Sequence, residues 1–248
     1  MTSILVTGGT GTLGSLVCER LRERGHAVRV LSRHARPYAV DLRDGSGLEA
    51  AVDGVDAIVH CASTPRGGDD RAAAHLLSAA RGASVPHLLY ISIVGVDRLP
   101  LGYYRMKHKA ERMIEEAGKR GPGWTVLRTT QFHDLVFRLM AGAARLPVLP
   151  LPSGVRLQPV DAGEVADRLA ELAVGAPAGR VEDMGGPQVR PLPDLAHAYL
   201  RATGRRRPVV PVRLAGKTYA GYLAGAQLTP DRAVGKITFE EYLAHRLG

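Results

Sequence analysis

A glycine-rich segment near the N-terminus constrains the fold more than any other feature of this sequence. Residues 7–14 read TGGTGTLG, after an apolar run at residues 3–7 and before residues 12–24, where leucine and valine recur at helical spacing. Glycines at G-x-G-x-x-G spacing permit a tight turn and let the backbone at a helix start approach a pyrophosphate. The alternative is an ordinary glycine-rich strand-to-helix turn. We therefore predict a dinucleotide-binding loop formed by Gly8, Gly9, Thr10, Gly11, Thr12, Leu13 and Gly14.

Strand and helix patterns alternate along the first two-thirds of the chain. Further strands are predicted at residues 27–31, 39–42, 57–61, 87–92 and 124–127, and helices at residues 48–52, 71–81 and 103–117. Strands separated by helices form parallel βαβ units. We therefore predict an α/β fold, a Rossmann-type doubly wound parallel sheet. Helices are also expected at residues 162–174, 194–203 and 239–247, so that residues 145–248 form a small C-terminal substrate lobe of one domain, residues 1–248.

Composition excludes several classes of protein. The 248 residues are 45% hydrophobic and 23% charged, which is typical of a globular chain and excludes a disordered one. Two cysteines are too few for a disulfide scaffold or a multi-cysteine zinc site, and they suit a reducing compartment. No apolar run is long enough to span a membrane, and the N-terminus does not resemble a secretory signal. We expect a cytoplasmic protein with no metal and no membrane partner.

The net charge of +9 allows two interpretations. One is attraction to nucleic acid or an anionic membrane. The other is an arginine-rich composition together with one phosphate-rich ligand. The basic residues are scattered, aromatic residues make up only 5% of the chain, and the dense run at residues 205–207 follows a glycine in an expected loop. We therefore favour the second interpretation and expect no nucleic-acid partner.

The end of the second predicted strand indicates which nucleotide is bound. An acidic residue there would hold the ribose 2′-hydroxyl of NAD, but residues 31–36 read LSRHAR and contain no carboxylate. Arg33 and Ser32, with Arg36 in reserve, are instead suited to a 2′-phosphate, because a guanidinium matches phosphate geometry. The sequence therefore predicts NADP(H), unless Arg33 is a solvated surface residue.

Two further strand ends are expected beside the cofactor. Asp41 and Leu42 end the third predicted strand, where the adenine would lie, although Asp41 is equally typical of a plain turn. Cys61, Ala62 and Ser63 follow the fourth strand, and small side chains there would let the cofactor ribose pass close by. Cys61 is interpreted as packing rather than as a nucleophile, because no partner base is evident in the sequence.

A tyrosine and a lysine supply candidate proton chemistry. Tyr103 and Lys107 are four residues apart, so they share one face of the predicted helix. A nearby ammonium lowers the pKa of a phenol, and lysine can also hold the nicotinamide ribose. Ser92 ends the fifth strand and could hydrogen-bond a substrate carbonyl, and Ile91 is expected beside the cofactor. The alternatives are that Tyr103 packs, that Lys107 is solvated, or that Tyr104 is the acid.

These motifs together resemble the short-chain dehydrogenase/reductases, and within them the atypical NmrA-like or NAD(P)H-binding proteins. The resemblance rests on VTGGTGTLG at residues 6–14, LSR at 31–33, ISIVGVD at 91–97, YYRMKHKAE at 103–111 and LRTTQFHD at 127–134. It implies a Rossmann domain, an NADP(H) or NAD(H) cofactor and a small substrate lobe. It also implies that Thr130, Gln131 and Phe132 contact the nicotinamide or the substrate, although an ordinary strand-to-helix connection is an equal alternative.

The sequence also departs from the family pattern. Typical members use a catalytic asparagine, whereas this chain contains none. The step from Ser92 to Tyr103 is slightly shorter than usual, which weakens the transfer of a Ser–Tyr–Lys triad. The short tail argues against a sugar-nucleotide epimerase.

We therefore expect an NADPH-dependent reductase that passes hydride to a carbonyl, quinone or conjugated double bond, with Tyr103 as proton donor. A non-catalytic NADP(H)-binding redox sensor of the NmrA type is the alternative, and nonredox use of the cofactor is a third. A largely apolar set is expected to line the pocket, which predicts an apolar or aromatic small-molecule substrate: Val94, Leu99, Leu101, Phe132, Phe137, Leu139, Met140, Leu146, Val148 and Tyr222. A monomer or homodimer is expected.

Overall fold

The computed structural model describes residues 1–63 and 67–248, which form two compact units. The first unit consists of Met1–Ser92, Leu101–Arg128 and Gly163–Glu182. The second consists of Ile93–Pro100, Thr129–Ala162 and Asp183–Gly248. The chain therefore passes between the units several times, and residues 145–248 contribute to both of them. Each unit is described by itself below.

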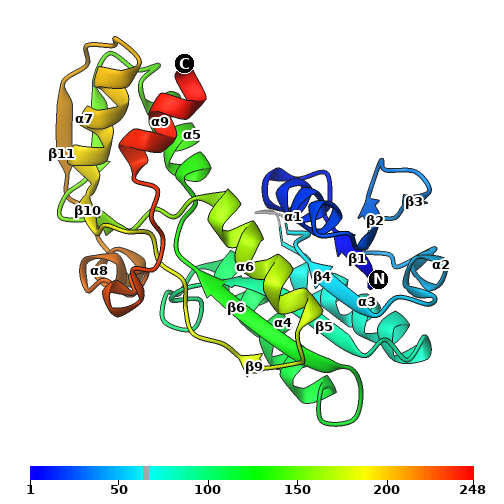
Figure 1. Ribbon diagram of the computed structural model, residues 1–248. Helices are drawn as coiled ribbons and strands as arrows, with labels where there is room; N and C mark the ends of the chain where they lie inside the picture. The colour runs from blue at the N-terminus through cyan, green and yellow to red at the C-terminus, as the bar shows by residue number, and fades with distance from the viewer. Residues whose placement is uncertain (64–66) are drawn as a thin grey trace. The chain divides into compact units, whose positions relative to one another are not determined.

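A seven-stranded sheet organises the first unit (Figure 1). Its strand order is β3-β2-β1-β4-β5-β6-β9. The strands are β1 (Ser3–Thr7), β2 (Ala27–Ser32), β3 (Tyr38–Ala39), β4 (Ala57–His60), β5 (His87–Ile93), β6 (Gly123–Thr129) and β9 (Gly179–Arg180). β1 pairs in parallel with both β2 and β4. The order 3-2-1-4-5-6 with parallel pairing is that of a doubly wound dinucleotide-binding sheet, so the predicted fold class is confirmed.

Helices cover both faces of this sheet. They are α1 (Thr12–Glu23), α2 (Leu48–Val52), α3 (Asp69–Gly82), α4 (Gly102–Ala117) and α6 (Ala162–Val174). In Figure 1, α1 and α6 lie on the viewer's side of the sheet, and α3 and α4 lie behind it. Ion pairs from Arg20 and Arg24 to Asp167 join α1 to α6. Because both faces are covered, β1 and β4 are almost completely buried apolar runs.

The second unit has a core of its own. Its helices are α5 (His133–Ala143), α7 (Leu192–Ala202), α8 (Lys217–Leu223), η1 (Pro230–Arg232) and α9 (Phe239–Leu247). β7 (Leu149–Pro152) pairs in parallel with β11 (Val209–Val212), and β8 (Arg156–Leu157) pairs antiparallel with β10 (Arg190–Pro191). Side chains of α5, α7 and α9 pack into one apolar cluster, which orders this proline-rich part of the chain.

Two predicted elements differ from the structure near the site. The third strand was predicted at residues 39–42, but β3 ends at Ala39. The chain turns at Asp41 because its carboxylate accepts a hydrogen bond from the backbone N–H of Arg43, at 2.9 Å. The helix predicted at residues 71–81 begins earlier, at Asp69, after Gly68 in a left-handed conformation. Among the described residues, no helix combines the length and the apolar character needed to cross a membrane.

Candidate functional site

The glycine loop between β1 and α1 is packed too closely for larger residues. A Cβ on Gly8, whose φ is +67°, would lie 2.7 Å from the Cα of Ala62. A Cβ on Gly14 would collide with the carbonyl oxygen of Gly8. Gly11 caps α1 without a side-chain hydrogen bond, so N–H groups of the first turn stay available to a ligand. The loop therefore fits the pyrophosphate of a dinucleotide.

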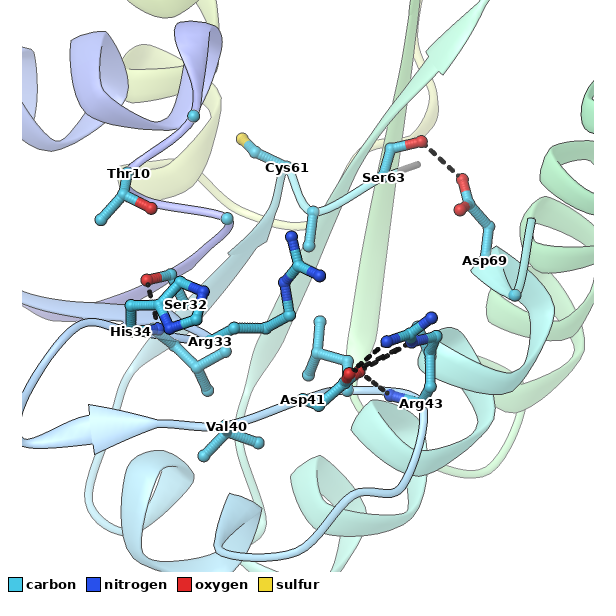
Figure 2. A pocket seen from close by; sticks show the side chains of 17 residues that line it. Thr10, Ser32, Arg33, His34, Val40, Asp41, Arg43, Cys61, Ser63 and Asp69 are labelled. Carbon is cyan, nitrogen blue, oxygen red and sulfur yellow. Dashed lines mark hydrogen bonds and ion pairs between the residues drawn. The ribbon is translucent and has the colours of Figure 1, made fainter. Parts of the chain in front are cut away.

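A cavity of about 310 Å³ opens beside this loop (Figure 2). It lies at the carboxyl ends of β1, β2 and β4 and beside the start of α3, which is the ligand-binding edge of a doubly wound sheet. The structure brings these predicted cofactor residues together around it: Gly8, Thr10, Gly11, Ser32, Arg33, Asp41, Leu42, Cys61, Ala62 and Ser63. Gly9, Thr12, Leu13, Gly14 and Ile91 belong to the same unit but do not line the cavity.

The end of β2 presents one arginine to the cavity. Arg33 and Arg36 are both exposed, but Figure 2 shows the Arg33 side chain extending into the pocket, whereas Arg36 does not line it. Ser32 Oγ accepts hydrogen bonds from the backbone N–H groups of Ala35 and His34, at 3.1 and 3.4 Å. The serine therefore holds the turn after β2 with both lone pairs of its oxygen, and its O–H remains as a donor toward a phosphate.

Asp41 and Arg43 form an ion pair on the opposite wall. Arg43 Nε lies 3.0 Å from Asp41 Oδ1, and a second guanidinium nitrogen contacts Oδ2 (Figure 2). Hydrogen bonds from Arg43 hold the pKa of the Asp41 carboxyl well below its usual range. Asp41 is therefore an ionised residue of this turn, it lines the cavity, and Arg43 offsets its charge.

Cys61 follows β4 and lines the cavity. Desolvation raises the pKa of its thiol to about 12, with Cys18 contributing in the same direction and Lys107 opposing it. A thiol that stays protonated at neutral pH is a poor nucleophile. This agrees with the packing role expected from the sequence.

Ser63 connects the cavity to the proposed acid. Its Oγ lies 2.7 Å from the hydroxyl of Tyr103, at the start of α4, and donates to Asp69 Oδ2 at 2.7 Å. Asp69 is only 2% exposed. Three polar groups from the β4 loop, α3 and α4 thus form a continuous hydrogen-bonded chain.

Lys107 is buried one turn along α4 from Tyr103. Its Nζ donates to Tyr90 Oη at 2.9 Å and to the carbonyl oxygen of Ile91 at 3.2 Å, and it pairs with Asp69 at 3.4 Å. It also lies 5.9 Å from the ring centroid of Tyr103. The predicted helix face is therefore present. The lysine is not solvated, because protein groups surround it.

Burial decides the proton state of Tyr103. Desolvation raises its pKa above the ordinary value, and the opposing effects of Lys107 and of the Ser63 hydrogen bond do not outweigh it. The neighbouring Asp69 and Tyr90 also raise the pKa. Contrary to the expectation from the sequence, Lys107 does not make this phenol more acidic than usual, because desolvation outweighs the lysine charge. Tyr103 is a neutral phenol at neutral pH and can donate a proton.

The remaining predicted residues have different surroundings. Ser92 is 1% exposed, and its Oγ has no hydrogen-bond partner among the described residues. Thr130, Gln131 and Phe132 belong to the second unit. There Thr130 Oγ1 accepts from the Gly186 N–H at 3.2 Å, and Phe132 caps α5.

Sequence reasoning missed Asp69, Tyr90, His34 and Arg43. His34 and Arg43 line the cavity, and Asp69 and Tyr90 hold Lys107. Asp69 is one of two adjacent acidic residues at a helix start, which is the usual place for a solvated aspartate. The pairing of Asp69 with a lysine 38 residues away leaves no local signal.

A family model described as NAD(P)H-binding matches residues 8–136, which include the glycine loop, β4 and Tyr103. The chain belongs to the NAD(P)H-binding family. The resemblance to NAD(P)H-binding proteins is thereby confirmed. No group of three metal-binding side chains occurs in the part of the chain that the structure describes.

Two curated relatives of this family member are reductases. The chain is 30% identical over 162 residues to divinyl chlorophyllide a 8-vinyl-reductase of Oryza sativa subsp. indica, covering 53% of this chain and 40% of the relative. It is 28% identical over 220 residues to (4-alkanoyl-5-oxo-2,5-dihydrofuran-3-yl)methyl phosphate reductase of Streptomyces griseus, covering 82% of this chain and 74% of the relative. The match with the plant reductase thus spans less than half of that protein.

Solved structures show the same fold at low identity. An NADPH-dependent quinone oxidoreductase of Escherichia coli, complexed with NADPH, superposes with a TM-score of 0.81 at 19% identity, over 99% of this chain and all of the other. A UDP-N-acetylglucosamine 4-epimerase of Bacillus cereus superposes with a TM-score of 0.73 at 19% identity, over 100% of this chain and 96% of the other. The fold is therefore shared by reductases and epimerases and does not by itself decide the reaction.

Proposed function

We propose that this chain is an NADPH-dependent reductase of an apolar or aromatic carbonyl, quinone or conjugated double bond. The observation that carries the proposal is the half-buried Tyr103 hydroxyl, which is hydrogen-bonded to cavity-lining Ser63 at 2.7 Å. NADPH supplies the hydride when bound. Tyr103 donates the proton, Ser92 steadies the developing oxyanion, and Lys107 fixes the surroundings of the phenol.

The cavity supports a 2′-phosphorylated nucleotide. Arg33 extends into the pocket, and no carboxylate follows β2 within residues 31–36. Asp41, the acidic residue of the opposite wall, is already paired with Arg43. The net local charge therefore favours NADPH over NADH.

The relatives support the reductase over the epimerase. The plant and Streptomyces relatives are reductases, and the E. coli protein of similar fold is a quinone oxidoreductase. These names cover a vinyl group, an unsaturated furanone and a quinone, all of them conjugated acceptors. We infer that the substrate is a conjugated small molecule.

The first experiment measures cofactor binding by calorimetry. NADPH should bind more tightly than NADH, and Arg33→Ala should weaken NADPH binding by about 1.5–3 kcal/mol, the range of a charge-assisted hydrogen bond. Arg36→Ala is the matched control, because Arg36 is exposed and outside the cavity lining. Equal losses in the two variants, or a preference for NADH, would contradict the nucleotide assignment.

The second experiment measures NADPH oxidation with a panel of quinones, enones and carbonyls. Tyr103→Phe should lower turnover by about 10²–10⁴-fold, the usual contribution of a general acid. Tyr104→Phe is the control, because Tyr104 is its buried neighbour on α4. A sugar nucleotide converted faster than every member of the panel would overturn the substrate class.

A redox sensor is the second candidate. The observation that favours it is the burial of Lys107, which is 3% exposed and held by three protein groups. A sensor needs the glycine loop and Arg33 but not Tyr103. Tight NADPH binding without turnover on any acceptor would favour the sensor over the reductase.

A further inference from the structure

Ser63 does more than line the cavity, because its hydroxyl contacts two other polar side chains. Its Oγ lies 2.7 Å from Tyr103 Oη and 2.7 Å from Asp69 Oδ2. Ser63 is exposed and lines the cavity, whereas Asp69 is buried and ion-paired with Lys107. Figure 2 shows the serine hydroxyl pointing toward the carboxylate at the cavity wall. One hydroxyl therefore connects the candidate acid, a fixed charge and solvent.

Donor and acceptor rules orient this chain of groups. The Ser63 hydroxyl has one proton, and it donates this proton to Asp69 Oδ2. The Ser63 oxygen is then free to accept the proton of Tyr103. At rest, the phenol proton thus already lies on the line between Tyr103 and Ser63.

We propose that Ser63 is the proton relay that returns a proton to Tyr103 after each reduction, and that Asp69 is the positioning residue that holds Ser63 in place. The proposal rests on the proposed role of Tyr103 as proton donor. Neither Asp69 nor the Ser63–Tyr103 contact was expected from the sequence.

The proton transfers balance. The Tyr103 O–H bond breaks as its proton passes to the acceptor, which also receives the hydride of NADPH. As a proton from hydronium or a buffer acid bonds to the Ser63 oxygen, the proton that Ser63 donates to Asp69 turns toward Tyr103 and passes to the phenolate oxygen. One Ser63 O–H bond breaks while another forms, so no serine alkoxide is left, and the exposed Ser63 side chain is open to the acid. The net change is one hydride and one proton added to the acceptor, and the protein returns to its starting state.

The charges around Tyr103 favour recapture of the proton. Among the described residues, the groups that act on its charge are Lys107 from its own helix, Asp69 from α3, Tyr90 from β5 and Ser63, which follows β4. Asp69 disfavours a negative charge on the phenol, and Lys107 favours one. Because burial outweighs the effect of Lys107, protonation of a phenolate left after turnover is favourable, and Ser63 is in contact to pass on a proton from a stronger acid in solvent.

The test compares Ser63→Ala with Ser63→Thr in the full chain. The threonine keeps the hydroxyl, so it should retain turnover within about threefold of wild type, whereas alanine should lower kcat by about 10–100-fold. The Kd for NADPH and the KM for the acceptor should change far less than kcat. The loss in Ser63→Ala should be larger at high pH, where hydronium is scarce, and small buffer acids should partly restore its turnover.

Three outcomes would overturn the proposal. They are wild-type kcat in Ser63→Ala, equal losses in Ser63→Ala and Ser63→Thr, and a lowered kcat that neither pH nor buffer acid changes. The Tyr103→Phe variant shows whether only the relay through Ser63 is wrong or whether the proposed function is wrong as well. If Tyr103→Phe loses turnover and Ser63→Ala does not, only the relay is wrong, whereas full turnover in Tyr103→Phe would remove the proposed proton donor itself.

Discussion

Replacing Asp69 with asparagine tests the buried ion pair that anchors the candidate site. Asp69 and Lys107 side chains are 2% and 4% exposed, and their charged atoms lie 3.4 Å apart. At an effective dielectric constant of about 20, that separation gives about 5 kcal/mol of attraction before desolvation is counted. Removing one partner of a buried pair usually costs about 3–5 kcal/mol, because the remaining charge is left uncompensated.

The expected loss for Asp69→Asn is at the lower end of that range. Lys107 keeps hydrogen bonds to Tyr90 Oη and to the Ile91 carbonyl oxygen, and it lies 4.6 Å from the Tyr90 ring centroid. We therefore expect a loss of about 3 kcal/mol in the free energy of unfolding, a large fraction of the roughly 5–15 kcal/mol that stabilises a folded protein. The assay is urea unfolding at pH 7, with the m value checked for constancy.

A neighbouring pair between the same two helices provides the control. Asp70 of α3 pairs with Lys109 of α4 at 2.9 Å, but that lysine is 64% exposed. Asp70→Asn should therefore cost less than about 1 kcal/mol. In the double variant Asp69→Asn/Lys107→Met, no uncompensated charge remains, so the loss should be smaller than the sum of the single losses. Equal losses for Asp69→Asn and Asp70→Asn, or strict additivity in the double variant, would refute this reasoning.

Two further predictions concern the glycine loop and a buried histidine. Gly14→Ala should abolish NADPH binding measured by calorimetry, because the added Cβ meets the Gly8 carbonyl. Gly82→Ala is the control and should leave binding intact, because a Cβ there meets nothing within 4 Å. Loss of binding in both variants would contradict the packing argument. Burial, and secondarily the Lys107 charge, lowers the pKa of His60 to about 3, so the unfolded chain binds a proton that the folded one does not. Stability contributed by keeping His60 neutral is therefore lost as pH falls below about 6.5, by up to about 1.4 kcal/mol per pH unit. Urea unfolding at pH 7, 6 and 5 should show this slope reduced in His60→Gln, and an unchanged slope would contradict it.

The sheet could be predicted from the sequence because its signals are local. β1 matches the predicted range of residues 3–7, and the strands that follow appear in the predicted order. β9, which has only Gly179 and Arg180, was missed. A two-residue edge strand has no apolar periodicity, so only its pairing with β6 defines it.

The candidate site could be predicted only where the residues that act together are close to one another in the sequence. The glycine loop, Arg33 and the shared helix face of Tyr103 and Lys107 come from spacing within one element. The partners of Lys107 cannot be predicted from spacing, because Tyr90 is typical of an apolar strand and Asp69 is typical of a solvated helix start. The pKa of Tyr103 was misjudged for the same reason, since burial is a property of the folded molecule.

The most direct test of the central claim is deuterium transfer from NADPH labelled at the nicotinamide C4 position. The account predicts that wild-type protein passes the label to a quinone or enone, with a primary isotope effect on the single-turnover rate and with transfer abolished or strongly slowed in Tyr103→Phe. Tight NADPH binding with no label in any reduced acceptor would contradict the account, because the cavity would then hold the cofactor without using its hydride.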